Sequence, residues 1–137
     1  SAFLICQTLY PLMASNDHGS IILISSIYGS VGPDMALYKG TAMENPVGYG
    51  ASKGGLLQLM RYLSTLLAPK IRVNALSPGG VERGQPQAFI DRYSERTPLG
   101  RMASERDLVG PAVFLASDMS AYITGHDLKV DGGWSAW

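Results

Sequence analysis

The clearest strand signal in the sequence is the segment Gly19-Ser20-Ile21-Ile22-Leu23-Ile24-Ser25-Ser26. It contains four consecutive apolar residues, three of them β-branched, and such a run is typical of a strand covered on both faces of a parallel sheet. Two shorter runs, 71–77 and 128–130, have a similar composition. We therefore predict strands over 20–26, 71–77 and 128–130.

Segments with helical character separate these strands. Apolar residues recur at helical spacing in 47–67, and we expect the buried stripe to comprise Leu56, Leu59, Met60, Leu63, Leu66 and Leu67. A further helix is predicted over 1–14, with Pro11 ending or kinking it near its last turn. Strands that alternate with helices indicate an α/β fold with a parallel sheet.

The segments that flank the second strand are less regular. Residues 27–46 are rich in Gly, Pro and polar side chains and are expected to form a long loop. Residues 78–103 are also expected to be mostly loop, with a short helix over 86–92. A capping box at Ser104-Glu105-Arg106-Asp107 then predicts a helix that runs to about residue 116.

Tyr49 and Lys53 are the strongest chemical signal in the chain. On a helix, side chains four residues apart leave the same face about one turn from each other. A phenol is a poor proton donor or acceptor at neutral pH, and a neighbouring ammonium favours its ionised form. The pair therefore suits general acid–base catalysis, although a surface helix pair is the structural alternative.

Two further signals fall near this pair. In an open α/β sheet, reactive groups gather beyond the carboxyl ends of the strands. Ser26 ends the first predicted strand, and the turn 78–81 ends the second. Ser26 could instead serve only as a hydroxyl that stabilises a turn, and Ser25 and Asn74 are both interpreted as structural.

Four segments resemble, in the same order, the signatures of the short-chain dehydrogenase/reductase family. They are Ser25-Ser26-Ile27-Tyr28-Gly29, Tyr49-Gly50-Ala51-Ser52-Lys53, Arg72-Val73-Asn74-Ala75-Leu76-Ser77-Pro78-Gly79 and Val130-Asp131-Gly132-Gly133. The resemblance covers nearly the whole chain. It implies a Rossmann-like, doubly wound parallel sheet, of which this chain would supply the second half.

The resemblance also implies roles for matching residues. Tyr49 would exchange a proton with the substrate oxygen, and Ser26 would hydrogen-bond the same oxygen. Lys53 would favour the phenolate of Tyr49 and hold the ribose hydroxyls of a nicotinamide cofactor. Backbone groups of Pro78, Gly79 and Val81 would line the carboxamide of that cofactor.

The chain departs from the family at its start. The family's glycine-rich turn, which binds the cofactor pyrophosphate, has no counterpart here. Residues 1–13 instead resemble the middle of the family's fourth helix. We therefore expect 1–137 to be the carboxyl-terminal, substrate-side half of such a domain. The residue that selects NAD or NADP also has no counterpart, so either cofactor is expected for the intact protein. Without the pyrophosphate-binding turn, this chain alone is expected to be inactive and to bind neither cofactor well.

The stretch between Ser26 and Tyr49 is about ten residues longer than the family usually has. Long loops at the rim of a site are commonly functional. We expect this loop to hold the substrate through Asp34, Tyr38, Lys39 and Thr41; packing on a neighbouring subunit is the alternative. The sequence around it resembles family members found with flagellin-glycan and nonulosonic-acid sugar pathways, which suggests a polyol or amino-sugar substrate.

Arg83 stands where the family often has Thr. It could bind a phosphate or carboxylate of the substrate, or point to solvent, and solvent is the preferred interpretation.

A sheet that contains only the second half of the family's strands would expose the outer edge of strand 20–26, and an exposed apolar edge promotes association or aggregation. Helices 1–14 and 47–67 match those that form the main dimer contact in the family, so a homodimer or homotetramer is expected.

Composition excludes several function classes. The formal net charge is zero, which argues against nucleic acid and anionic membranes as partners. Cys6 is the single cysteine, so no internal disulfide can form, and a reducing cytoplasm is the simplest location. No His, Cys or carboxylate set has metal-ligand spacing, and no apolar stretch is long enough to span a bilayer.

Three function classes stay open at this stage. The leading one is an NAD(P)-dependent oxidoreductase acting on a small molecule. The second is a truncated, non-catalytic oligomerising module of the same family. The third is a hydrolase with Ser26 activated by Lys53, which is disfavoured because no Gly-x-Ser-x-Gly motif surrounds the serine.

Overall fold

A three-stranded parallel sheet forms the centre of the computed structural model, which describes residues 1–16 and 18–137. Its strands are β1 (Gly19–Ile24), β2 (Ile71–Pro78) and β3 (Asp127–Val130), arranged in the order β1-β2-β3. All neighbouring strands are parallel. The predicted α/β fold is confirmed.

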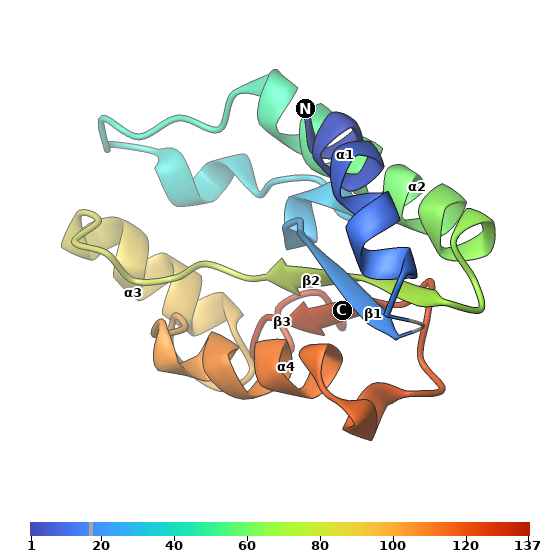
Figure 1. Ribbon diagram of the computed structural model, residues 1–137. Coiled ribbons are helices and arrows are strands. Elements are labelled where there is room, and N and C mark those ends of the chain that lie inside the picture. Colours follow the sequence, from blue (N-terminus) through green and yellow to red (C-terminus); the bar gives the residue numbers. More distant parts are fainter. Residues whose placement is uncertain (17) are drawn as a thin grey trace.

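Helices lie on both faces of this sheet. The helices α1 (Ala2–Ala14) and α2 (Val47–Leu66) cover one face, and α4 (Arg106–Ala116) covers the other (Figure 1). The helix α3 (Gln87–Arg96) lies beyond the carboxyl ends of the strands, on the same side as segment 27–46 (Figure 1). Among the described residues, no helix combines the length and the apolar character needed to cross a bilayer.

The main core lies between α2, α1 and the sheet. Its buried members are Cys6, Leu23, Leu57, Met60, Leu63, Leu67, Ile71, Val73 and Ala75. The predicted stripe of α2 is correct at Met60, Leu63 and Leu67 but wrong at Leu66, which is 59% exposed. Leu57, which was not in the predicted stripe, is buried and belongs to the same core cluster as Val73 and Ala75 of β2.

Glycines allow α2 to approach the end of β1 closely. A Cβ on Gly29 would lie 2.9 Å from the backbone of Lys53, and a Cβ on Gly50 would lie 3.1 Å from the carbonyl oxygen of Tyr28. On the same face, Gly54 approaches the carbonyl of Gly29. This close packing sets the position of Lys53 relative to the strand end.

Several predicted boundaries are corrected. The first strand ends at Ile24 and not at Ser26, because the Ser26 side chain accepts a hydrogen bond from the Tyr28 amide and opens a 3₁₀ helix over Ile27–Gly29. A second 3₁₀ helix, Met35–Tyr38, begins at Asp34 in the same way. The predicted long loop therefore contains two short helices, and α3 extends beyond residue 92.

A second buried cluster joins segment 27–46 to α3 and the carboxyl-terminal residues. It comprises Ile27, Leu37, Phe89, Tyr93, Met102 and Trp134. Two arginines of α3 strengthen this contact: Arg92 donates to the carbonyls of Leu37 and Lys39, and Arg96 pairs with Asp34 at 3.0 Å. Segment 27–46 is thus packed on its own chain.

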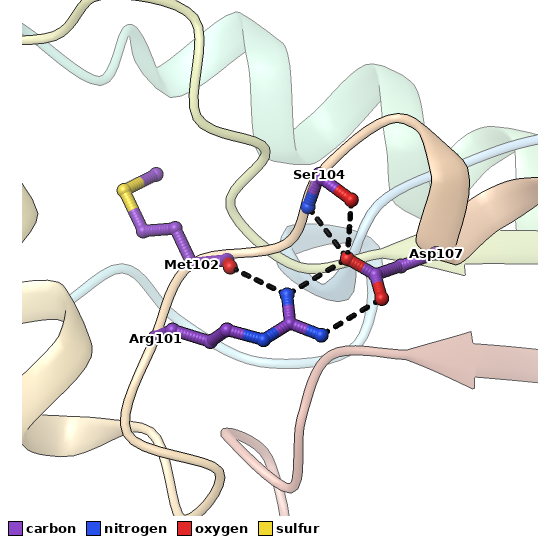
Figure 2. A network of polar contacts seen from close by, with 4 residues as sticks. All are labelled: Arg101, Met102, Ser104 and Asp107. Carbon is purple, nitrogen blue, oxygen red and sulfur yellow. Dashed lines mark hydrogen bonds and ion pairs between the residues drawn. The ribbon is translucent and has the colours of Figure 1, made fainter.

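The predicted capping box is found in part. The Asp107 carboxylate accepts hydrogen bonds from the Ser104 amide and hydroxyl, as one half of a capping box requires (Figure 2). The Ser104 hydroxyl donates to Asp107 and does not cap a backbone amide, and α4 begins only at Arg106. Arg101 forms two further hydrogen bonds with Asp107, each 2.8 Å long (Figure 2).

Candidate active site

A cavity of about 400 Å³ lies at the carboxyl ends of β1 and β2. It is lined by Ser26, Tyr49, Lys53, Pro78, Gly79 and Val81, the six residues that the sequence places in the catalytic and cofactor sites. Parallel strands bring their carboxyl ends to one edge of the sheet, so segments distant in sequence meet there. The volume is in the range of small-molecule sites, about 300–1,000 Å³.

The two serines after β1 have different environments. Ser25 donates its hydroxyl hydrogen bond to the Lys53 carbonyl at 3.0 Å, which supports the structural interpretation of this residue. Ser26 is 5% exposed, and its oxygen accepts from the Tyr28 amide. Its own hydroxyl proton is not used in that bond, so Ser26 can donate to a ligand in the cavity.

Tyr49 and Lys53 lie one turn apart on the amino-terminal half of α2, as predicted. The Lys53 ammonium lies 5.6 Å from the centre of the Tyr49 ring and donates a 3.0 Å hydrogen bond to the Ile24 carbonyl. That bond ties the ammonium to the end of β1 and leaves two of its three protons for other acceptors. The Tyr49 side chain is accessible from the cavity.

Tyr93 of α3 fixes the turn after β2. Its hydroxyl oxygen accepts a 2.6 Å hydrogen bond from the Gly80 amide, and a Cβ on Gly80 would lie 2.8 Å from the Tyr93 ring. Burial raises the pKa of Tyr93 to about 12, although the Gly80 hydrogen bond acts in the opposite direction. Sequence reasoning did not identify this residue, since nothing local links positions 80 and 93.

The four residues of the predicted substrate loop are not all found at the cavity. Only Tyr38 lines it. Asp34 caps a 3₁₀ helix and pairs with Arg96, and Thr41 forms hydrogen bonds within the loop to Tyr38 and Met43. Lys39 is exposed, and its carbonyl accepts from Arg92.

Other cavity residues were missed by the sequence prediction. They are Tyr28, Met43, Gln85, Phe89, Met102 and Leu108 together with Tyr93. Asn45 contacts the cavity wall by donating a 3.1 Å hydrogen bond to the Tyr38 hydroxyl. Tyr28 could have been suspected because it lies two residues after Ser26 in the 3₁₀ turn, whereas the others come from segments that only the tertiary fold brings to the cavity.

Arg83 reaches the cavity but is paired. Its guanidinium forms a 2.9 Å ion pair with Glu105, and both side chains are largely exposed. The preferred interpretation, that Arg83 points to solvent, agrees with its 68% exposed side chain, and the ion pair with Glu105 is an addition that the sequence did not predict. The pair links the turn after β2 to the start of α4, and a screened surface pair of this kind contributes little to stability.

Asn74, interpreted from the sequence as structural, is fully buried in β2. Its amide donates to the Ile123 carbonyl at 2.9 Å, and its carbonyl oxygen accepts from the His126 amide at 3.0 Å. Within the described residues, no group of His, Cys, Asp or Glu is arranged to hold a metal ion.

A family model described as Enoyl-(Acyl carrier protein) reductase matches residues 1–135. Post-translational flagellin modification protein A of Campylobacter coli is 34% identical over 129 residues, which are 93% of this chain and 50% of that protein. The ribulose-forming D-arabinitol 2-dehydrogenase of Candida tropicalis is 38% identical over 136 residues, which are 93% of this chain and 45% of that protein.

Solved structures of dehydrogenases are also similar to this chain. A short chain dehydrogenase from Leptospira borgpetersenii with bound NAD+ has a TM-score of 0.90 and 40% identity, covering 98% of this chain and 52% of that one. A gluconate 5-dehydrogenase from Burkholderia cenocepacia in complex with NADP and tartrate has a TM-score of 0.85 and 31% identity, covering 98% and 52%. The chain thus spans about half the length of the proteins it matches.

Proposed function

This chain belongs to the short-chain dehydrogenase/reductase family, and from that premise we propose that it forms the substrate side of an NAD(P)-dependent oxidoreductase. The reaction interconverts a hydroxyl and a carbonyl on a small polar substrate. The observation that carries the proposal is that Ser26, Tyr49 and Lys53, from two different elements, line one cavity. The expected likeness to dehydrogenases of flagellin-glycan pathways agrees with the Campylobacter relative.

The cavity fits a nicotinamide group on the side of the turn 78–81. Pro78, Gly79 and Val81 line it there, and Lys53 keeps two protons free for the hydroxyls of a ribose. When bound, a nicotinamide cofactor supplies or accepts the hydride. Related structures contain NAD+ or NADP, and the proposal includes either cofactor.

The proton is handled by residues of this chain. Tyr49 exchanges it with the substrate oxygen, because its hydroxyl is accessible in the cavity. Lys53 favours the ionised form of Tyr49 through its charge. Ser26 donates a hydrogen bond to the same substrate oxygen and stabilises the charge that develops on it.

The proposed substrate class is a sugar or polyol. Two similar proteins carry the names of dehydrogenases for D-arabinitol and gluconate, which are polyhydroxylated compounds. The cavity supports this class because hydroxyl and amide side chains, including those of Tyr28, Tyr38 and Gln85, line it beside apolar ones. In the predicted substrate loop, Tyr38 would then contact the substrate directly. Asp34, Lys39 and Thr41 would instead stabilise the loop that forms this wall of the cavity.

The first test replaces the proposed proton donor. In a protein that also carries the cofactor-binding half, Tyr49→Phe is expected to lower kcat for oxidation of D-arabinitol or a related polyol by about 10²–10⁴-fold, the usual contribution of a positioned acid or base. Binding of NADH, measured by calorimetry, should stay within about twofold of the wild type. Tyr62→Phe, at an exposed position of the same helix, is the matched control. Full turnover by Tyr49→Phe would refute the mechanism.

A non-catalytic oligomerising module is the second candidate function. It is favoured by exposed apolar side chains on α1, among them Leu4, Ile5 and Leu12. Calorimetric titration with NADH and with NADPH separates the two candidates. Micromolar binding supports the oxidoreductase, whereas association of the chain without binding of either cofactor supports the module.

A further inference from the structure

Two tyrosines and an asparagine meet at one wall of the cavity. The Tyr28 and Tyr38 hydroxyl oxygens are 3.4 Å apart, and the Asn45 side-chain amide donates to the Tyr38 oxygen at 3.1 Å. Both tyrosines line the cavity that also holds Ser26 and Tyr49. None of the roles proposed for the catalytic residues uses this cluster.

The cluster is held rigidly by the buried aromatic residues behind it. The Tyr28 ring packs edge-on against Trp134 at 6.0 Å, and the Tyr38 ring packs against Phe89 at 5.3 Å. Tyr38 is held further by the main-chain contacts of Arg92 with residues 37 and 39. A hydroxyl fixed in this way loses little conformational freedom when it binds a ligand.

Counting protons shows that the cluster retains one donor. Each phenol carries one proton, and one of the two protons is shared between the hydroxyls. Because Asn45 donates to Tyr38, it occupies an acceptor position and uses neither phenolic proton. One O–H group is therefore available to an oxygen atom in the cavity, and the donation from Asn45, which polarises the Tyr38 hydroxyl, favours Tyr38 as its carrier.

Tyr28, the other phenol of the cluster, is uncharged. Burial, followed by the hydrogen bond with Tyr38, raises the pKa of Tyr28 far above its ordinary value, so this phenol stays protonated at neutral pH. The described residues that line the cavity include no carboxylate, and Arg83 is already paired with Glu105. A neutral hydroxyl group is the ligand oxygen that matches such a donor, with Met43 and Phe89 beside it for the C–H groups of the ligand.

We propose that the Tyr28–Tyr38–Asn45 cluster is the specificity site of this cavity, and that it donates one hydrogen bond to a hydroxyl of a neutral polyol at a carbon other than the reacting one. This inference rests on the proposed function for the identity of the reacting group. It assigns substrate discrimination to segment 27–46 and leaves the proton transfer to Tyr49.

The test uses D-arabinitol and analogues that each lack one hydroxyl. Tyr38→Phe is expected to raise KM for D-arabinitol roughly tenfold with little change in kcat, because a neutral hydrogen bond made before and during the reaction contributes uniform binding. For the analogue that lacks the hydroxyl bound by the cluster, the wild type and Tyr38→Phe should have equal KM values. A merely structural role of Tyr38 would weaken all analogues alike, and that result would overturn the proposal.

Asn45→Asp provides a second, independent variant. A carboxylate at position 45 accepts the proton that Tyr38 would offer to the substrate, so this variant should resemble Tyr38→Phe in its pattern over the analogues. Asn16→Asp, in an exposed turn after α1, is the matched control and should change nothing. A pattern for Asn45→Asp identical to that of the wild type would contradict the proton count.

Saturation-transfer NMR of D-arabinitol with the unmodified chain separates this proposal from the proposed function. Polyol binding that is weakened by Tyr38→Phe but not by Tyr62→Phe supports the specificity site. This conclusion holds even if Tyr49→Phe keeps full turnover and the role proposed for Tyr49 is wrong. Lack of polyol binding to the wild type, together with turnover of simple alcohols that depends on Tyr49, would overturn the specificity site and leave the oxidoreductase intact.

Discussion

At the scale of single residues, two of the three proposed catalytic groups are held by hydrogen bonds to the backbone, Lys53 from a distant segment and Ser26 from its own turn. Lys53 donates to the Ile24 carbonyl, and Ser25 donates to the Lys53 carbonyl, so the end of β1 and α2 fix each other. Ser26 is oriented by the Tyr28 amide. Such secondary contacts keep a site in its working geometry before a ligand arrives.

Tyr93 offers a direct test of one of these contacts. Tyr93→Phe leaves the Gly80 amide without its acceptor and should lower the free energy of unfolding by about 1–3 kcal/mol, the cost of an unsatisfied buried donor. Urea denaturation measures the change. Tyr62→Phe, exposed on α2, is the control and should differ from the wild type by less than about 0.5 kcal/mol. Equal stabilities of the two variants would show that Gly80 finds another partner.

Asp107 makes stability depend on pH. The side-chain hydrogen bonds from Arg101, followed by those from Ser104, hold the pKa of Asp107 well below its ordinary value of about 3.9. A lowered folded-state pKa stabilises the protein above pH ~4, and this contribution is lost as the pH falls below that value. Asp107→Asn should therefore lower Tm at pH 7, and the difference from the wild type should shrink below pH ~4.

A thermal denaturation series at several pH values, for wild type and Asp107→Asn, measures this dependence. Asp118→Asn, at an exposed position outside the network, is the control. A difference in Tm that stays constant from pH 7 to pH 2 would contradict the assignment of the effect to the Asp107 carboxylate.

At the scale of secondary structure elements, the close approach of α2 to the 3₁₀ helix after β1 brings together the two segments that carry the proposed catalytic residues. Gly29, Gly50 and Gly54 lie at this contact, where an added Cβ would meet backbone atoms of the facing segment at 2.9–3.3 Å. By contrast, Gly48 and Gly55 have open space beside them. The glycines thus have different roles within one helix.

Gly29→Ala tests this contact. Its Cβ would lie 2.9 Å from the Lys53 backbone, so the 3₁₀ helix or α2 must shift, at a cost of about 1–3 kcal/mol in unfolding free energy. Gly55→Ala, inside α2 with no atom nearby, is the control and should stabilise the helix by up to about 1 kcal/mol. Chemical denaturation of both variants measures the difference, and equal effects would contradict the close packing.

At the scale of the whole molecule, apolar surface remains exposed on two sides. The outer edge of β1 has no neighbouring strand among the described residues, and Ile24 at its end is 53% exposed. Ile5 and Leu12 of α1 are 61% and 68% exposed. Unpaired strand edges and contiguous apolar surface promote association. The expected homodimer or homotetramer stays a prediction, which this surface motivates.

Sedimentation velocity tests that prediction. The chain should sediment as an oligomer, and Leu12→Glu should shift the distribution toward monomer because a charge in an apolar interface is costly to desolvate. Met119→Glu, at an exposed position outside α1, is the control and should leave the distribution unchanged. A monodisperse wild-type monomer that binds no hydrophobic dye would contradict the prediction.

The strands, the four main helices and the pairing of Tyr49 with Lys53 could be predicted from the sequence, because they depend on local periodicity and on a spacing of four residues, which a helix converts directly into a shared face. Ser26 was added to this pair from its place at a strand end and from the family resemblance. The shared edge at which the carboxyl ends of the strands meet then follows from the parallel sheet, whereas the strand order β1-β2-β3 was known only from the structure.

The other residues that line the cavity could not be predicted from the sequence, because tertiary packing brings them there. The contact of Tyr93 with Gly80, that of Tyr38 with Tyr28 and the burial of Leu57 in place of Leu66 all depend on how whole elements pack. Asp34 likewise looked like a ligand group but pairs with Arg96, 62 residues away in sequence. Such contacts depend on close packing between side chains that are distant in sequence. Local sequence patterns carry little information about which distant side chains become neighbours.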